Sequence, residues 1–124
     1  FDGTQLATEP PAEWMRLYHP SLPWYIDVER DSESERGITV RDMLTQMHRQ
    51  LMIPVMESDV WNEDMTKEGR KLVAQGPRRR AGRAADGGLI FEGYGAVRLD
   101  FLGNEYIFEG LVARRSGIWE IKTR

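Results

Sequence analysis

Cysteine is absent from this 124-residue sequence, and histidine occurs only twice. The first absence excludes disulfide bonds, thiol nucleophiles and sulfur-ligated metals. The two histidines stand in different segments without the spacing of a metal-binding pair. No apolar run approaches the ~18 residues that a membrane-spanning helix needs. We therefore expect no disulfide, no metal, no cofactor and no membrane partner.

Catalytic motifs are missing as well. The sequence has no G-x-S-x-G or S-x-x-K nucleophile motif, and its Gly-rich stretches lack the spacing of phosphate-binding or dinucleotide-binding loops. Glu109 and Glu120, on strands predicted to be neighbours, are more simply explained as solvated or salt-bridged surface carboxylates than as an acid–base pair. The sequence therefore favours a protein that is not an enzyme.

The lack of cysteine and of an N-x-Ser/Thr sequon favours an intracellular protein. The sequence begins at Phe1 rather than at methionine, which leaves open a signal peptide that has been removed.

Charge is unevenly distributed along the chain. The net charge is −3, yet residues 69–85 contain six basic residues and no acidic one. Residues 29–36, in contrast, carry four acids against two bases. Gly and Pro punctuate the basic stretch, so we expect a mobile basic loop at about residues 76–88.

The strongest pattern lies between residues 38 and 55. Apolar residues recur there at helical spacing, after Thr39 and Asp42 have formed a variant capping box. Pro54 ends the pattern, because its ring cannot continue a helix. These features predict an amphipathic helix.

Four methionines lie in or just after this helix. Met43 and Met47 are four residues apart on its apolar face, which favours core packing. Met52 and Met56 lie near or beyond its end, where an adaptable methionine can contact a partner.

The remaining elements predict a small α+β domain. Residues 1–13 resemble a flexible tail, and residues 14–124 are expected to form one domain. Alternation predicts a strand at residues 24–28, and Ser58 is a plausible N-cap for a second helix that ends near Gly76. The C-terminal segment from residue 97 predicts a three-stranded antiparallel meander, with turns at Gly103–Asn104 and Ser116–Gly117. The predicted fold is thus a small antiparallel sheet covered on one face by two helices.

Several short sequences in this order resemble a family of domains of unknown function from mushroom-forming fungi. The resemblance covers roughly residues 19–124. The matching residues are Thr39, Val40, Asp42, Met43 and Leu44, then Ile53 and Pro54, Leu99–Gly103, Gly110 and Leu111, and Trp119. The resemblance implies an α+β layout and no particular activity.

By elimination, the sequence favours a protein- or peptide-interaction module. The candidate binding residues are Trp14, Met52, Met56, Arg78, Arg79 and Arg80. The final strand, with no residue left to shield it, predicts a bare sheet edge through which a homodimer could form. The alternative is binding of single-stranded nucleic acid or RNA through Arg78–Arg83, although a sequence pI of about 5.4 is unusual for such a protein.

Overall fold

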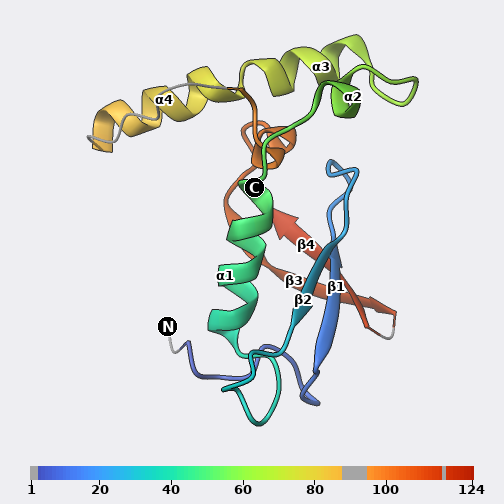
Figure 1. Cartoon of the computed structure of the whole chain (residues 1–124), viewed down its shortest axis with the longest axis vertical. Helices are drawn as coiled ribbons and strands as arrows, with labels where there is room; N and C mark the ends of the chain where they lie inside the picture. The colour runs from blue at the N-terminus through green and yellow to red at the C-terminus, as the bar shows by residue number, and fades with distance from the viewer. Residues whose placement is uncertain (1–2, 88–94, 116) are drawn as a thin grey trace. The chain divides into compact units, whose positions relative to one another are not determined.

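The computed structural model describes residues 3–87, 95–115 and 117–124 of the chain (Figure 1). The chain divides into two compact units. Unit 1 is formed by the residues up to Gln50 together with Ile107–Arg124, and unit 2 is formed by Leu51–Tyr106. Among the described helices, none has the length and apolar character that a membrane crossing requires.

Unit 1 is built on a four-stranded sheet whose strands come from both ends of the chain. They are β1 (Trp14–Tyr18), β2 (Ile26–Glu29), β3 (Phe108–Arg115) and β4 (Ile118–Thr123). The order in the sheet is β2-β1-β4-β3. The pairs β1–β2 and β3–β4 are antiparallel, whereas β1 and β4 run parallel. The α+β class with a small sheet is confirmed, but the sheet is mixed rather than wholly antiparallel.

The predicted strand at residues 24–28 corresponds to β2, while the predicted three-stranded meander is wrong. Arg98–Leu102 forms a 3-10 helix, η1, in unit 2. The buried carboxylate of Asp100 accepts the backbone N–H of Val97 at 2.8 Å, and this local bond favours a tight turn over an extended strand. Gly103 has the expected positive φ of 61°, but it ends η1 instead of forming a hairpin.

The last strand lies inside the sheet, which corrects the expected bare edge. β4 has β1 on one side and β3 on the other. The parallel pairing of Leu17 with Trp119 joins distant parts of the chain, so no local sequence pattern predicts it. The outer strands are β2 and β3, and a homodimer through β4 therefore loses its physical basis.

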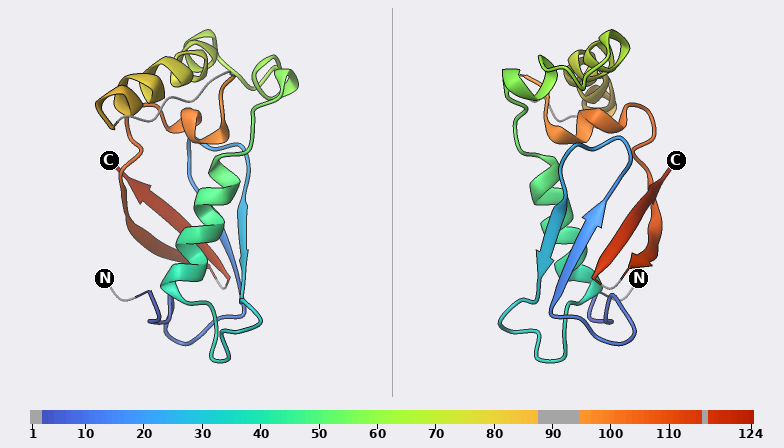
Figure 2. Two further views of the ribbon diagram at one scale, coloured as in Figure 1. Left: turned by 60° about the vertical axis from the view of Figure 1, so that its left-hand side comes forward. Right: turned by 90° about the vertical axis from the view of Figure 1, so that its right-hand side faces the viewer.

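The inner face of the sheet forms the core of unit 1 beneath α1 (Val40–Leu51) (Figure 2). Its most deeply buried side chains, each at most 4% exposed, are Met15 and Leu17 of β1, Ile26 and Val28 of β2, and Ile121 of β4. Met43 and Met47 of α1 are buried as well, which confirms them as core residues. In the right-hand view of Figure 2, α1 lies behind the strands, and no helix of unit 1 covers their outer face.

The N-terminus of α1 is closed by the predicted capping box. The hydroxyl of Thr39 accepts the N–H of Asp42 at 3.1 Å, and the Asp42 carboxylate accepts the N–H of Thr39 at 3.0 Å. Burial by itself would raise the pKa of Asp42, but hydrogen bonds to its carboxylate, from Thr39 and Ser34 among others, outweigh burial and lower the pKa. The carbonyl of Gly3 also accepts the N–H of Arg41, so the N-terminal segment helps to satisfy the first turn. Flexibility of residues 1–13 stays a prediction.

The described residues of unit 2 form η1 and three helices. The helices are α2 (Glu57–Val60), α3 (Lys67–Ala74) and α4 (Gly76–Gly87). The single helix predicted from Ser58 is thus two helices. α2 ends at Val60, and Thr66 begins α3 as a new N-cap by accepting the N–H of Gly69 at 2.9 Å.

Residues 76–87 form α4 rather than the predicted mobile loop, whose last residue lies outside the described residues. Pro77 lies in the first turn, where its missing N–H is tolerated, and arginine and alanine are good helix formers. Arg80 is buried, and its guanidinium donates to both carboxylate oxygens of Asp100, at 3.0 and 3.1 Å. This ion pair holds α4 against η1.

Candidate functional site

An apolar groove of about 520 Å³ lies in unit 2. Seven of its lining residues are apolar, and we call the two most exposed of them, Met56 and Trp61, its side walls. We call the other five apolar lining residues its floor: Val55 and Val60, Val73 and Ala74 of α3, and Ala96. We call this the Met56–Trp61 groove.

Both side walls of the groove are open to solvent. The side chains of Met56 and Trp61 are each 67% exposed, the highest values among the large apolar residues of the described chain. Isolated exposed apolar residues are common, but two that line one apolar depression indicate a contact surface. The side chains of Met56 and Trp61 are therefore available for contact with a partner.

The Trp61 wall is held in place from within unit 2. The Arg70 guanidinium carbon lies 4.7 Å from the centre of a Trp61 ring, at cation–π distance. Arg70 also donates to the carbonyl of Met65 at 2.9 Å. These contacts reduce the conformational entropy that the indole would lose on binding.

The floor is fixed by a short pairing of two segments. The N–H of Val55 donates to the carbonyl of Ala96 at 2.9 Å, and the N–H of Arg98 donates to the carbonyl of Ile53 at 3.0 Å. Between these bonds, Pro54 and Val97 form an antiparallel bridge. Backbone pairing thus places Val55 and Ala96 of the floor next to each other.

The predicted binding residues lie in different surroundings. Met56 lines the groove, whereas Met52 is half-buried and is not among the lining residues. Trp14 belongs to β1 of unit 1 and is 44% exposed.

The three predicted arginines on α4 are not equivalent. Arg78 is exposed and Arg79 is half-buried, with a bond of 3.3 Å from its guanidinium to the carbonyl of Asp100. Arg80 is engaged in its buried ion pair, which a ligand would have to break in order to bind it.

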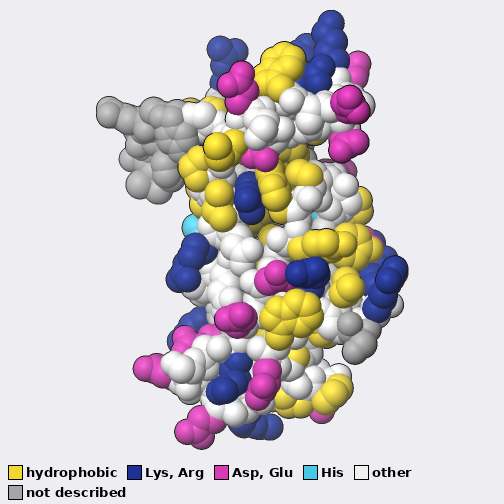
Figure 3. Space-filling view, turned by 45° about the vertical axis from the view of Figure 1, so that its right-hand side comes forward, with side chains coloured by type: hydrophobic (Ala, Val, Ile, Leu, Met, Phe, Trp, Pro, Cys, Tyr) yellow, Lys and Arg dark blue, Asp and Glu magenta, His cyan; other side chains and the backbone are white. Residues whose placement is uncertain are grey.

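The outer face of the sheet in unit 1 carries a second group of exposed aromatic residues. The Arg16 guanidinium lies between Trp14, at 5.5 Å from the ring centre, and Tyr25, at 4.7 Å. Asp27 accepts two hydrogen bonds from Arg16, at 2.8 and 3.1 Å, and raises its pKa. Figure 3 shows hydrophobic side chains lying next to both acidic and basic ones, with no large area of one charge sign.

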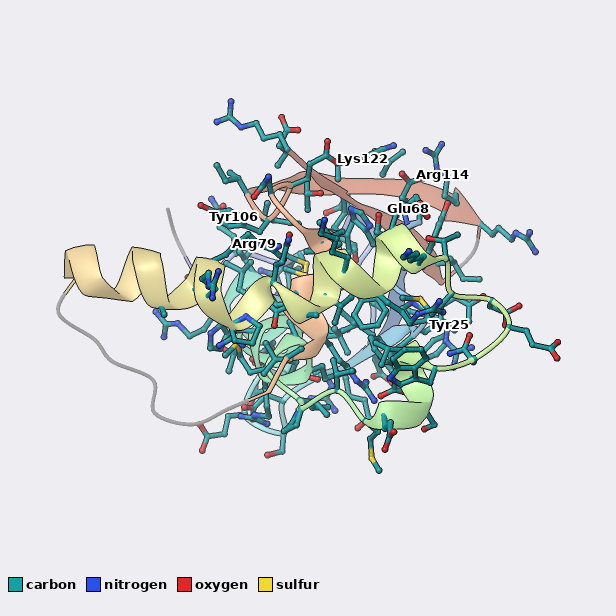
Figure 4. All side chains as sticks on the ribbon, turned by 90° about the horizontal axis from the view of Figure 1, so that it is seen from above. Tyr25, Glu68, Arg79, Tyr106, Arg114 and Lys122 are labelled. Atoms are coloured by element: carbon teal, nitrogen blue, oxygen red, sulfur yellow. The ribbon has the colours of Figure 1, made fainter. Side chains whose placement is uncertain are left out.

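Glu120 is the centre of a charged cluster on the same sheet. Its carboxylate pairs with Lys122 and accepts bonds from Arg114, at 2.7 and 2.9 Å, and from the Tyr18 hydroxyl, at 2.9 Å. In Figure 4, Arg114 and Lys122 extend from the ribbon of β3 and β4. The bonds from Lys122, Arg114 and Tyr18 lower the pKa of Glu120 from 4.5 to about 2. Glu120 is therefore ionised near neutral pH and is no proton donor there.

The Glu120 cluster predicts a pH dependence of stability. Because the pKa of Glu120 is lowered on folding, its contribution is present above the unfolded pKa and is lost as the pH falls from about 5 toward 2. We expect Glu120→Gln to lose less unfolding free energy than the wild type over this interval. Urea unfolding at several pH values measures the difference. Glu109→Gln, which alters an exposed carboxylate on β3, is the matched control and should follow the wild type. Equal pH profiles for wild type and Glu120→Gln would contradict the prediction.

Comparison with known proteins places the chain in a family. The family of unknown function DUF6699 matches residues 2–117. The chain belongs to DUF6699. No curated protein and no solved structure gives a significant match. Membership of DUF6699 assigns no activity, so a function for this chain has to be argued from its own surfaces.

The described part of this DUF6699 chain offers little for metal chemistry. Among residues 3–87, 95–115 and 117–124, no group of three or more His, Asp or Glu side chains could hold a metal ion. His19 accepts the N–H of Ser21 at 3.0 Å, as expected of a turn residue, and His48 is exposed on α1.

Sequence reasoning missed Trp61 as a site residue of this DUF6699 chain. Its spacing to Met65 fits the apolar stripe of a continuous helix, which would have buried both residues. Thr66 is the residue that could have indicated the position of Trp61, because threonine favours the N-cap position over the interior of a helix. A break at Thr66 removes Trp61 from the stripe.

Proposed function

We propose that this DUF6699 protein is a non-catalytic protein- or peptide-interaction module whose Met56–Trp61 groove receives a large apolar side chain of its partner. The observation that supports the proposal is an apolar floor flanked by two side chains that are 67% exposed. With it we propose a fungal source and an intracellular location, following the sequence resemblance and the lack of cysteine.

The energetics of interfaces favour such a site. Tryptophan is enriched among the residues that dominate binding energy, and these residues lie in depressions from which water is excluded. Covering Met56 and Trp61 would remove apolar surface from water at ~25 cal/mol per Å². Arg70 already orients the Trp61 ring, so little ordering remains to be done on binding.

Methionine methyl NMR tests the proposal residue by residue. The protein, labelled with ¹³C at the methionine methyl groups, is titrated with short polar peptides that each contain one Leu, Phe or Trp. We expect the Met56 signal to shift and saturate, while the signals of Met43 and Met47 in unit 1 stay in place. Trp61→Ala should weaken binding at least tenfold, since interface tryptophans are typical hot spots worth about 2 kcal/mol or more.

Trp14→Ala is the matched control, because it removes another exposed tryptophan from a different unit. It should bind as the wild type does. Saturable binding that depends on Trp14 and not on Trp61 would move the site to the outer face of the sheet. Peptides that shift no methionine signal at millimolar concentration would contradict the proposal.

Two alternatives predict other results. Self-association would use the outer strand β3, and light scattering would then show a dimer that a proline at Val112 abolishes. Nucleic-acid binding would depend on Arg78 and Arg79, since Arg80 is engaged with Asp100. It would show as oligonucleotide binding that weakens steeply with salt and is lost in the Arg78→Glu/Arg79→Glu variant.

A further inference from the structure

The rim of the Met56–Trp61 groove carries an excess of positive charge. Lys67, Arg70 and Lys71 of α3 line it, against the single carboxylate of Glu57. The excess is local, because the whole chain has a net charge of −3. The groove thus combines an apolar floor with a basic rim on one side.

The three basic residues are not equally available. Arg70 is occupied by the Trp61 ring and by the carbonyl of Met65. Lys67 and Lys71 are exposed, and among the described residues neither forms an ion pair. They are four residues apart on α3, so their positions along the helix differ by about 6 Å and they face the same side. Two like charges so placed repel each other, and carboxylates of a partner beside them would reduce this repulsion.

We infer that the partner segment is an acidic peptide in which one large apolar side chain enters the groove and neighbouring carboxylates pair with Lys67 and Lys71. This inference rests on the proposed function, since it specifies the partner of the same groove. Carboxylates at positions i and i+4 of a partner helix have the spacing that the two lysines require. The apolar side chain supplies most of the affinity, and the charges select the partner.

The openness of the groove favours a protein segment over a small amphiphile. Sites for small molecules bury about 70–90% of the ligand surface. Here both side walls remain largely in water, so a fatty acid in the groove would stay partly hydrated. A protein surface can cover the outer sides of Met56 and Trp61 as well.

Residues 29–36 of a second copy do not fit as the occupant. Residues 29–36 contain four carboxylates but no apolar side chain. That segment could neutralise the rim but would leave the groove empty. The occupant therefore needs an apolar side chain next to its carboxylates.

Three fluorescein-labelled helical peptides test the inference by anisotropy. The first carries a Leu or Phe anchor with two pairs of Glu at i and i+4, the second has Lys in place of Glu, and the third keeps Glu but has Ser in place of the anchor. We expect the first to bind roughly tenfold more tightly than the second at low salt, as two exposed charge pairs allow. The difference should shrink as salt rises. The third should not bind measurably.

Charge reversal links the preference to the two lysines. Lys67→Glu/Lys71→Glu should reverse it, so that the Lys peptide binds better than the Glu peptide. Arg78→Glu, an exposed arginine of α4 that does not line the groove, is the matched control and should keep the wild-type order. Circular dichroism of each variant checks that its fold is intact.

The outcomes separate the inference from the proposed function. Equal binding of Glu and Lys peptides, still abolished by Trp61→Ala, would overturn the acidic partner and leave the groove as the binding site. No binding by any anchored peptide would overturn both. Displacement of the Glu peptide by an oligonucleotide would also overturn the acidic protein partner. So would a fatty acid that displaces the Glu peptide at a lower concentration than the unlabelled peptide does.

Discussion

Asp100→Ala is expected to lower the free energy of unfolding of unit 2 by about 3–5 kcal/mol, the typical cost of removing one partner from a buried ion pair. The side chains of Asp100 and Arg80 are 3% and 10% exposed, so water cannot replace the lost carboxylate. The substitution also leaves the N–H of Val97 without its acceptor. The remaining buried guanidinium accounts for much of the cost.

Urea unfolding followed by methionine methyl NMR measures this effect in the correct unit. The signals of Met56 and Met65 report on unit 2, and those of Met43 and Met47 report on unit 1. Glu68→Ala, which removes an exposed carboxylate from α3, is the control, with an expected change within about 0.5 kcal/mol. A similar small change for Asp100→Ala would show that the Arg80–Asp100 pair does not hold α4 on η1.

The same substitution should affect the groove. Val97 lies next to Ala96 of the floor and forms a bridge with Pro54, so loss of the Asp100 bond loosens the pairing that places Val55. Peptide affinity should therefore fall in Asp100→Ala, although Asp100 is not a lining residue. Fluorescence anisotropy with the first peptide, which carries the apolar anchor and the Glu pairs, measures the loss of affinity. The measurement is made without urea, where the fold is retained. Asp100 would act on binding only as a positioning residue.

Some parts of the fold could be predicted because their signals are local. α1 combines a capping box, a helical apolar pattern and a terminating proline, all within residues 38–55. β2 shows a simple alternation. The parallel pairing of β1 with β4 has no such signal, since it depends on a contact between residues 16–18 and 118–120.

Other parts of the fold could not be predicted, because the local sequence pattern was compatible with two conformations. Val97, Leu99 and Phe101 alternate as in a strand, yet Asp100 between them is buried and paired, and the segment is η1. Glycine and proline at residues 76 and 77 suggest a loop, yet they begin α4. In both places a buried partner, visible only in three dimensions, decides the conformation.

The candidate site was predictable only in part. Met56 could be identified because it follows the end of a helix, where an apolar side chain has no local partner. Trp61 and the basic rim could not, since their association depends on the break between α2 and α3. For Trp14 the sequence left exposure and burial open; the residue is 44% exposed, and what it binds remains a proposal.

Leu17→Ala is expected to have the largest effect on unit 1, with a loss of about 2–5 kcal/mol from the removed apolar contacts and the cavity left behind. Leu17 is fully buried in β1, an inner strand, where it pairs with Ile26 and Trp119. Such a site has strands on both sides, so the surroundings cannot collapse easily into the space. Tyr25→Ala on the outer face removes a side chain that is 56% exposed and should cost much less. The Met43 and Met47 signals during urea unfolding measure both effects. A Leu17→Ala variant as stable as Tyr25→Ala would mean that the inner face of the sheet is not the core of unit 1.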